Sequence, residues 1–215
     1  MKIFYPDSYR EWQKKYNSNI LKMNKTRLEA FSDGVLAIII TIMILEIKVP
    51  HGHEFADLKP LIPKFLSYIL SFIYVGIYWN NHHYLLHGLS KVNGKILWAN
   101  LHLLFWLSLI PVATGWMGEH NFAKAAMAFY GAILLLSAIA YVILQKTVLD
   151  VEGRDSVLAK ALAKDVKGKA SVILYTVGIV ASFYNEWISG AAYFIVAMSW
   201  LIPDKRIERV FASKN

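Results

Sequence analysis

Residues 27–50 read RLEAFSDGVLAIIITIMILEIKVP, a long apolar run that follows a short polar cluster and ends at a proline. A helix of about 20 apolar residues crosses the roughly 30 Å hydrocarbon core of a bilayer, so this run predicts a membrane-spanning helix. Thr26 and Glu29 have the spacing of a capping box, which predicts that the helix begins near Arg27. Pro50 predicts its end.

The rest of the chain also contains long apolar segments. Hydrophobic residues make up 56% of its 215 residues, more than a water-soluble domain of this size can bury. Further apolar segments cover residues 62–86, 96–117 with a kink expected at Pro111, 122–147, 170–184 and 188–202. The last two are short for spans, so either two short membrane helices or a re-entrant hairpin fits them. The sequence predicts an all-α membrane protein with about six transmembrane helices.

Charged residues divide the chain into parts and orient it. Residues 1–26 form a polar N-terminal segment, 27–203 a six-span unit with a polar insert at about 148–169, and 204–215 a basic tail. Most of the 23 Lys and Arg residues fall on one side of the alternating spans, so the positive-inside rule places both termini in the cytoplasm. Because the net charge of +8 is spread between apolar spans, we expect no nucleic-acid partner. The chain has no cysteine, which excludes disulfides and thiol chemistry.

The first span carries the main candidate site. Its start contains ionisable and small residues, namely Arg27, Phe31, Ser32, Asp33 and Gly34. Ionisable groups at a membrane helix indicate function because unpaired burial is costly, although residues this close to the helix start can also lie solvated at the interface.

Farther along the same helix, a stripe of side chains shares one face. It consists of Ile38, Thr41, Ile42 and Leu45, at positions i, i+3, i+4 and i+7. Most stripes of this kind pack against other helices, and Thr41 is the polar member.

Histidines form a second cluster. His82, His83 and His87 lie in the second span and His102 in the third. The i, i+4 spacing of His83 and His87 suits a metal, but no HExxH motif and no nearby acidic residue accompanies them. We therefore expect these histidines to lie at the membrane interface or to form hydrogen bonds with neighbouring helices, and we expect neither a metal nor another cofactor.

Residues 27–34, RLEAFSDG, match the whole RxxxFSDG signature, so the chain resembles the transmembrane protein 175 family of potassium channels. The six-span layout extends this resemblance over nearly the whole chain. It implies that Arg27, Ser32 and Asp33 form a polar network that holds the first helix against its neighbours. Animal members carry two six-span units and resemble dimers of doubled chains, so a chain with one unit would form a homotetramer.

The resemblance also implies a potassium-permeable cation channel without a P-loop filter. The first helices would line the pore, with Ile38 at the constriction, Thr41 one turn beyond it, and Ile42 or Leu45 completing the narrow stretch. The implied partners are lipid, potassium ions and further copies of the chain, and the implied location is a prokaryotic plasma membrane. No enzymatic activity is expected.

Two other functions remain open at this point. One is a channel whose main permeant ion is the proton. The other is an ion-coupled secondary transporter, which should show an internal repeat and broken helices with ionisable residues at mid-membrane; the first four spans show neither.

Overall fold

The computed structural model describes residues 7–153, 156, 158–159 and 166–201, and this part of the chain is helical with no strand. The elements in order are α1 (Asp7–Leu45), the 3-10 helix η1 (Phe55–Leu61), α2 (Ile62–His87), α3 (Gly94–Ser108), α4 (Ile110–Glu119), α5 (Lys124–Glu152), α7 (Val166–Ser182) and α8 (Glu186–Leu201). The prediction of an all-α membrane protein is confirmed. Residues 1–6, part of the predicted insert (154–155, 157 and 160–165) and the tail at 204–215 lie outside the described residues.

Four helical stretches are long and apolar enough to span a membrane: Lys25–Leu45, Phe55–His87, Gly94–Glu119 and Lys124–Glu152. The fourth stretch continues past the predicted end at residue 147, because residues 148–152 are still helical. The two C-terminal helices, α7 and α8, have 17 and 16 residues and are about 25 Å long. Residues 183–185 join them, and α7 packs along both α5 and α8.

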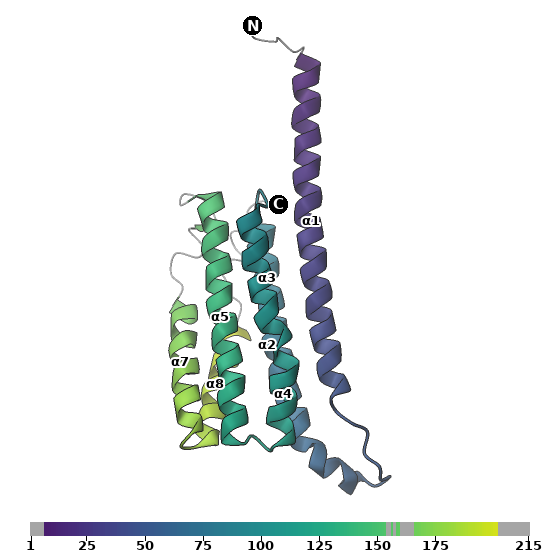
Figure 1. Cartoon of the computed structure of the whole chain (residues 1–215), viewed down its shortest axis with the longest axis vertical. Helices are drawn as coiled ribbons and strands as arrows, with labels where there is room; N and C mark the ends of the chain where they lie inside the picture. Colours follow the sequence, from purple (N-terminus) through teal and green to yellow (C-terminus); the bar gives the residue numbers. More distant parts are fainter. Residues whose placement is uncertain (1–6, 154–155, 157, 160–165, 202–215) are drawn as a thin grey trace.

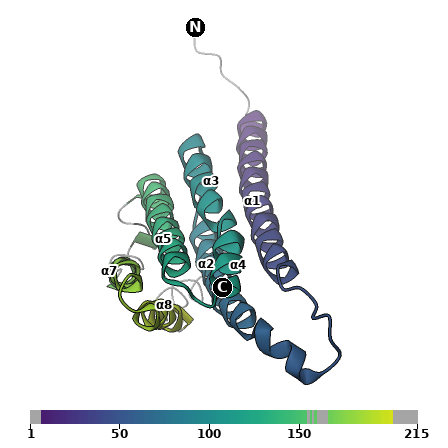
Figure 2. The ribbon, with the colours of Figure 1, turned by 60° about the horizontal axis from the view of Figure 1, so that its bottom comes forward.

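The helices form a bundle with α1 at one side and α7 at the other (Figure 1). Within the bundle, α1 contacts α2, α3 and α4. The N-terminal part of α1 extends well beyond the other helices, as both views show (Figures 1 and 2). The bundle therefore covers only one side of α1 and only its C-terminal half.

The predicted start of the first helix near Arg27 was wrong, because α1 begins at Asp7 and continues through Thr26 without a break. Residues 8–26 contain neither glycine nor proline, so nothing in the chain stops the helix from extending out of the membrane. The polar character of this stretch marks where the bilayer ends, while the helix itself runs on. At its other end α1 stops at Leu45, five residues before Pro50.

The third span is broken where the sequence predicts a kink. Helix α3 ends at Ser108 and α4 begins at Ile110, with Pro111 in the first turn of α4. Proline is tolerated there because the first N–H groups of a helix have no partner within that helix. The first half of the span packs against α5, and the second half, α4, packs against both α2 and α5.

Four buried tyrosines join the C-terminal helices to the rest of the bundle. Their ring centroids lie 5.9 to 6.4 Å apart in successive pairs, and they are Tyr74, Tyr130, Tyr175 and Tyr193. The Tyr74 hydroxyl donates to the backbone oxygen of Tyr193 at 2.6 Å, and the Tyr193 hydroxyl donates to the backbone oxygen of Met127 at 3.1 Å. The cluster ties α2 and α5 to α8.

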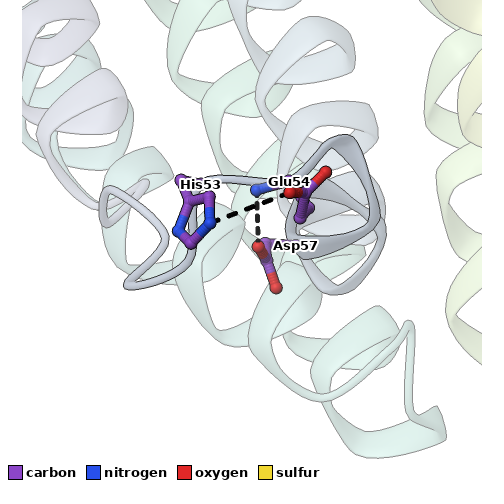
Figure 3. Close-up of polar contacts among 3 residues, drawn as sticks. All are labelled: His53, Glu54 and Asp57. Carbon is purple, nitrogen blue, oxygen red and sulfur yellow. Dashed lines mark hydrogen bonds and ion pairs between the residues drawn. The ribbon is translucent and has the colours of Figure 1, made fainter.

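Polar contacts connect elements at both ends of the bundle. At the end from which α1 extends, Lys25 Nζ donates to the backbone oxygen of His87 at 2.8 Å, and Ser90 Oγ donates to Glu152 Oε1 at 2.8 Å. At the opposite end, the connection between α1 and η1 is capped by Asp57, whose Oδ2 accepts from the backbone N–H of Glu54 at 2.9 Å (Figure 3). The His53 ring lies 3.7 Å from the Glu54 carboxylate in the same exposed turn.

Candidate pore helix and its polar anchor

Helix α1 has one buried face and one exposed face within its membrane span. The side chains that pack into the bundle are Leu28, Ser32, Leu36, Ile39 and Met43. Their spacing of three or four residues is that of a single helix face, which lies against α2, α3 and α4. This face fixes how α1 is rotated about its own axis.

The stripe that the sequence singles out lies on the exposed side. Ile38, Ile42 and Leu45 expose 57%, 42% and 72% of their surface, and Thr41 is exposed as well. None of these side chains is buried within the described part of the subunit. An apolar face of this kind in a membrane protein is covered by lipid or by another copy of the chain.

The Thr41 hydroxyl makes one hydrogen bond within its own helix. Its Oγ1 donates to the backbone oxygen of Ile38 at 2.9 Å, one turn back along the helix. Because the single hydroxyl proton is used in this bond, the oxygen lone pairs remain directed outward. The group can then act as an acceptor toward water or a cation, but not as a second donor.

A buried polar network anchors α1 in the N-terminal half of its candidate membrane span, Lys25–Leu45. Asn100 of α3 donates from Nδ2 to Ser32 Oγ at 3.0 Å, and its Oδ1 lies 2.6 Å from His82 Nε2 of α2. Ser32 Oγ also donates to the backbone oxygen of Leu28 at 2.8 Å. All three side chains are buried, so the network holds three helices together through bonds that water does not reach.

The remaining signature residues are distributed around α1. Asp33 accepts from Trp79 Nε1 of α2 at 3.0 Å. Arg27 and the half-exposed Phe31 instead line a groove of about 530 Å³ between α1 and the start of α3. Gly34 is exposed with no neighbour close to it. Ser32 thus contacts α3 and Asp33 contacts α2, whereas Arg27 takes part in neither contact.

The network includes one residue that the sequence reasoning missed. Asn100 was not among the candidates, although it is a carboxamide in the middle of the mainly apolar stretch ILWANLHLLFW, two residues before His102. A polar side chain inside a membrane span is itself a signal, because it must find a partner in another helix. That criterion, applied to uncharged residues as well as ionisable ones, would have found it.

The histidines of α2 and α3 make separate contacts. The rings of His83 and His87 stack at 6.0 Å on α2, and His102 accepts from Trp106 Nε1 at 2.9 Å on α3. Throughout the described ranges, no group of three or more His, Asp or Glu residues is placed to hold a metal ion. Of these four histidines, only His82 joins the buried network of Ser32 and Asn100.

A second polar cluster lies at the opposite end of α1. Glu46, Lys64 and Glu119 line a cavity of about 200 Å³, in which Lys64 Nζ is 3.6 Å from Glu119 Oε1. These ionisable residues stand at helix ends and not at mid-membrane. They therefore give no support to a transporter site of the broken-helix kind.

Comparison with known proteins identifies the family. Residues 27–111 match the family model described as endosomal/lysosomal potassium channel TMEM175. A Chryseobacterium protein named a potassium channel is 58% identical over 187 residues, which cover 87% of this chain and 97% of that protein. The human endosomal/lysosomal proton channel TMEM175 is 36% identical over 103 residues, which cover 42% of this chain and 20% of that protein.

A solved structure agrees with these matches over most of the chain. The crystal structure of a lysosomal potassium-selective channel TMEM175 homolog from Chamaesiphon minutus superimposes with a TM-score of 0.70 at 28% identity, covering 84% of this chain and 97% of that one. With its RLEAFSDG segment on α1 and its helical bundle, the chain belongs to the TMEM175 family of channels.

Proposed function

We propose that the chain is a potassium-permeable cation channel of a prokaryotic plasma membrane, in which four copies surround a pore lined by α1. The observation that carries this proposal is the uncovered stripe of Ile38, Thr41, Ile42 and Leu45. The names of the Chryseobacterium and Chamaesiphon relatives, both potassium channels, supply the ion. Conduction is passive and needs neither a cofactor nor enzymatic chemistry.

The position of α1 in the bundle supports a ring of subunits. It lies at the edge of the subunit, with its buried face on α2, α3 and α4 and its stripe turned away from them. A closed ring formed around this edge places four stripes next to one axis. The other spans then separate the pore from lipid, and both termini face the cytoplasm according to the distribution of Lys and Arg.

The proposed constriction is apolar, which sets how ions cross it. An isoleucine ring offers no ligand, so a narrow ring excludes water and blocks ions unless they keep much of their hydration. Potassium is less strongly hydrated than sodium and loses less when it sheds water. The Thr41 oxygens, one turn from Ile38, can accept from the ion's waters or contact the ion directly. We therefore expect preference for potassium without the strong selectivity of a carbonyl filter.

The direct test is a planar-bilayer recording with potassium on one side and sodium on the other. A reversal potential displaced toward the potassium equilibrium potential supports the proposal. A reversal potential that follows an imposed pH gradient would make protons the main permeant ion. Potassium uptake into vesicles that requires a second, coupled ion would make the protein a transporter.

A pair of variants tests the constriction. Ile38→Asn introduces polar groups at the proposed ring, so we expect higher conductance and weaker discrimination against sodium. Ile173→Asn is the matched control, because Ile173 exposes 64% of its surface on α7, at the far side of the bundle from α1. A well-assembled Ile38→Asn protein with unchanged current and reversal potential would show that Ile38 does not line the pore.

A further inference from the structure

The N-terminal part of α1, residues 7–24, projects past the other described helices, and we call it the protruding arm (Figures 1 and 2). Two of its aromatic side chains are exposed. Tyr9 exposes 39% of its surface and Trp12 exposes 56%, and their rings stack with centroids 6.1 Å apart. In the proposed orientation this end of the helix stands in water. Large aromatic side chains that are exposed together indicate an interaction surface.

The aromatic face of the arm points the same way as the exposed stripe that begins at Ile38. Tyr9 and Leu45 are 36 residues apart, which is about ten full turns of an α-helix, so they stand in one line along α1. Helical spacing places five apolar or aromatic positions of the arm within about 60° of that line, at intervals of three or four residues. These positions are Tyr9, Trp12, Tyr16, Ile20 and Met23.

The opposite side of the arm is polar. Glu11 lies about 160° around the helix from Tyr9 and is exposed. The Lys and Arg positions of the arm, at residues 10, 14, 15 and 22, also fall outside the aromatic face. The arm is therefore amphipathic, a pattern typical of a helix that packs on a partner with one side and faces water with the other.

The shape of α1 decides which partner fits this face. Aromatic residues opposite lysines also occur on helices that lie flat on a bilayer surface. Here the arm and the membrane span form one helix, Asp7–Leu45, and residues 8–33 contain neither glycine nor proline at which it could turn. The arm therefore stands along the axis of the span, and its aromatic face points in the direction that the stripe faces.

From this register we infer that the protruding arms of adjacent subunits pack on one another through Tyr9 and Trp12, in a parallel four-helix bundle that continues the ring of α1 helices outside the membrane. The inference rests on the proposed ring of four chains, in which the stripes face one axis. The partner of the arm is thus another copy of this chain, parallel and in register. Arg27 interrupts the apolar series between the arm and Ile38, and ions enter the pore between neighbouring helices at this polar level.

The ring predicts how far apart equivalent residues lie. Packed helices have axes about 8 to 10 Å apart. In a square of four such helices, inner Cα atoms of adjacent copies are about 5 to 7 Å apart and outer ones about 11 to 13 Å. A disulfide needs Cα atoms within about 7 Å of each other. Tyr9 and Trp12 occupy inner positions, whereas Glu11 occupies an outer one.

Disulfide formation tests this arrangement, because the chain has no cysteine of its own. Full-length chains with Tyr9→Cys, Trp12→Cys or Glu11→Cys are oxidised in membranes with copper phenanthroline, and linked dimers are measured on non-reducing gels. We expect the Tyr9→Cys and Trp12→Cys chains to link at least about tenfold faster than the Glu11→Cys chain. Glu11→Cys is the matched control, because Glu11 is exposed on the same turn, and labelling with a water-soluble maleimide corrects for differences in thiol reactivity.

A second measurement avoids cysteine chemistry. Trp12→Gln removes an aromatic ring from the proposed contact in all four copies, so we expect the tetramer fraction in dilute detergent to fall at least about tenfold. Trp12→Leu keeps an apolar side chain and should retain most of the tetramer. Glu11→Gln changes the outer side of the arm and should leave the tetramer fraction unchanged. These residues lie outside the bundle, so the fold of the single subunit should survive all three substitutions.

Ile38→Cys separates failure of this inference from failure of the channel proposal, because Ile38 lies in the proposed ring itself. Linking of Ile38→Cys without linking of Tyr9→Cys or Trp12→Cys would overturn the inference, since the arms would then diverge although the stripes meet. Protection of unlinked Tyr9→Cys from the maleimide by anionic vesicles would also overturn it, in favour of a lipid surface. Absence of linking at all three positions, in protein without ionic current, would remove the ring and the channel proposal together.

Discussion

Replacing Asn100 with alanine tests whether the buried network anchors α1. The substitution removes the Nδ2 bond to Ser32 Oγ and the 2.6 Å contact between Oδ1 and His82 Nε2. Ser32 keeps its donor bond to the backbone oxygen of Leu28, so its hydroxyl proton remains satisfied. His82 keeps no such substitute among the described contacts, and it is buried to 3% exposure.

The expected loss of stability follows from the hydrogen bonds that the substitution removes. A hydrogen bond between membrane helices contributes about 0.6 kcal/mol on average, which gives about 1.2 kcal/mol for the two. A buried polar group left without a partner adds about 1 to 3 kcal/mol for His82. We expect Asn100→Ala to lower the free energy of unfolding by about 2 to 4 kcal/mol, a change of roughly 30- to 1000-fold in the unfolding equilibrium constant.

The assay is unfolding of the full chain in mixed detergent micelles of rising SDS content, followed by circular dichroism and tryptophan fluorescence. Asn81→Ala is the matched control, because Asn81 Nδ2 donates only to the backbone oxygen of Ile77 in its own helix, at 2.8 Å. The control should change the free energy of unfolding by less than about 0.6 kcal/mol. Equal destabilisation of the two variants would refute the idea that the network joins helices.

Three further predictions follow from single contacts. Thr41→Ala removes the outward hydroxyl oxygen without narrowing the pore, so bilayer recordings should show weaker preference for potassium at similar conductance; an unchanged reversal potential would contradict this. Gly131→Ala places a methyl group against the Tyr193 side chain, so it should lower the free energy of unfolding in SDS by about 1 to 3 kcal/mol. The control Gly76→Ala has open space around it and should be neutral or stabilising. Asp57→Ala removes the cap of η1 at a cost of about 0.5 to 2 kcal/mol locally, so limited proteolysis should cut the connection before α2 faster, while an unchanged cleavage rate would show the cap to be unimportant.

Much of the fold is predictable because the bilayer imposes a length on apolar segments. The spans containing Ile38 and Tyr74 appear in the sequence as long, mainly apolar segments, and the break before Pro111 follows from the missing N–H of proline. The start of α1 at Asp7 was not predictable in this way. The residues before Thr26 are polar, and polarity reports where water begins but not where a helix ends.

In the candidate site, too, relations within one helix were predictable from the sequence and contacts between helices were not. A period of 3.6 residues suffices to group Ile38 with Leu45 on one face, because the relation is local to one helix. Whether that face is exposed depends on how Ser32 meets Asn100, a contact between residues 68 positions apart. The separation of Arg27 from Asp33 likewise depends on which neighbouring helix lies on each flank, and sequence spacing carries no information about that arrangement.

The continuity of α1 also gives it a mechanical property. Its 39 residues form one rod with no glycine or proline before Gly34. The rod is bonded to the bundle as far out as Lys25, and from Lys25 the protruding arm extends about 27 Å to Asp7. Leu28, Ser32, Leu36, Ile39 and Met43 hold the rest of the rod along its buried face. A force applied to the protruding arm is therefore carried along the helix axis and shared by this whole face.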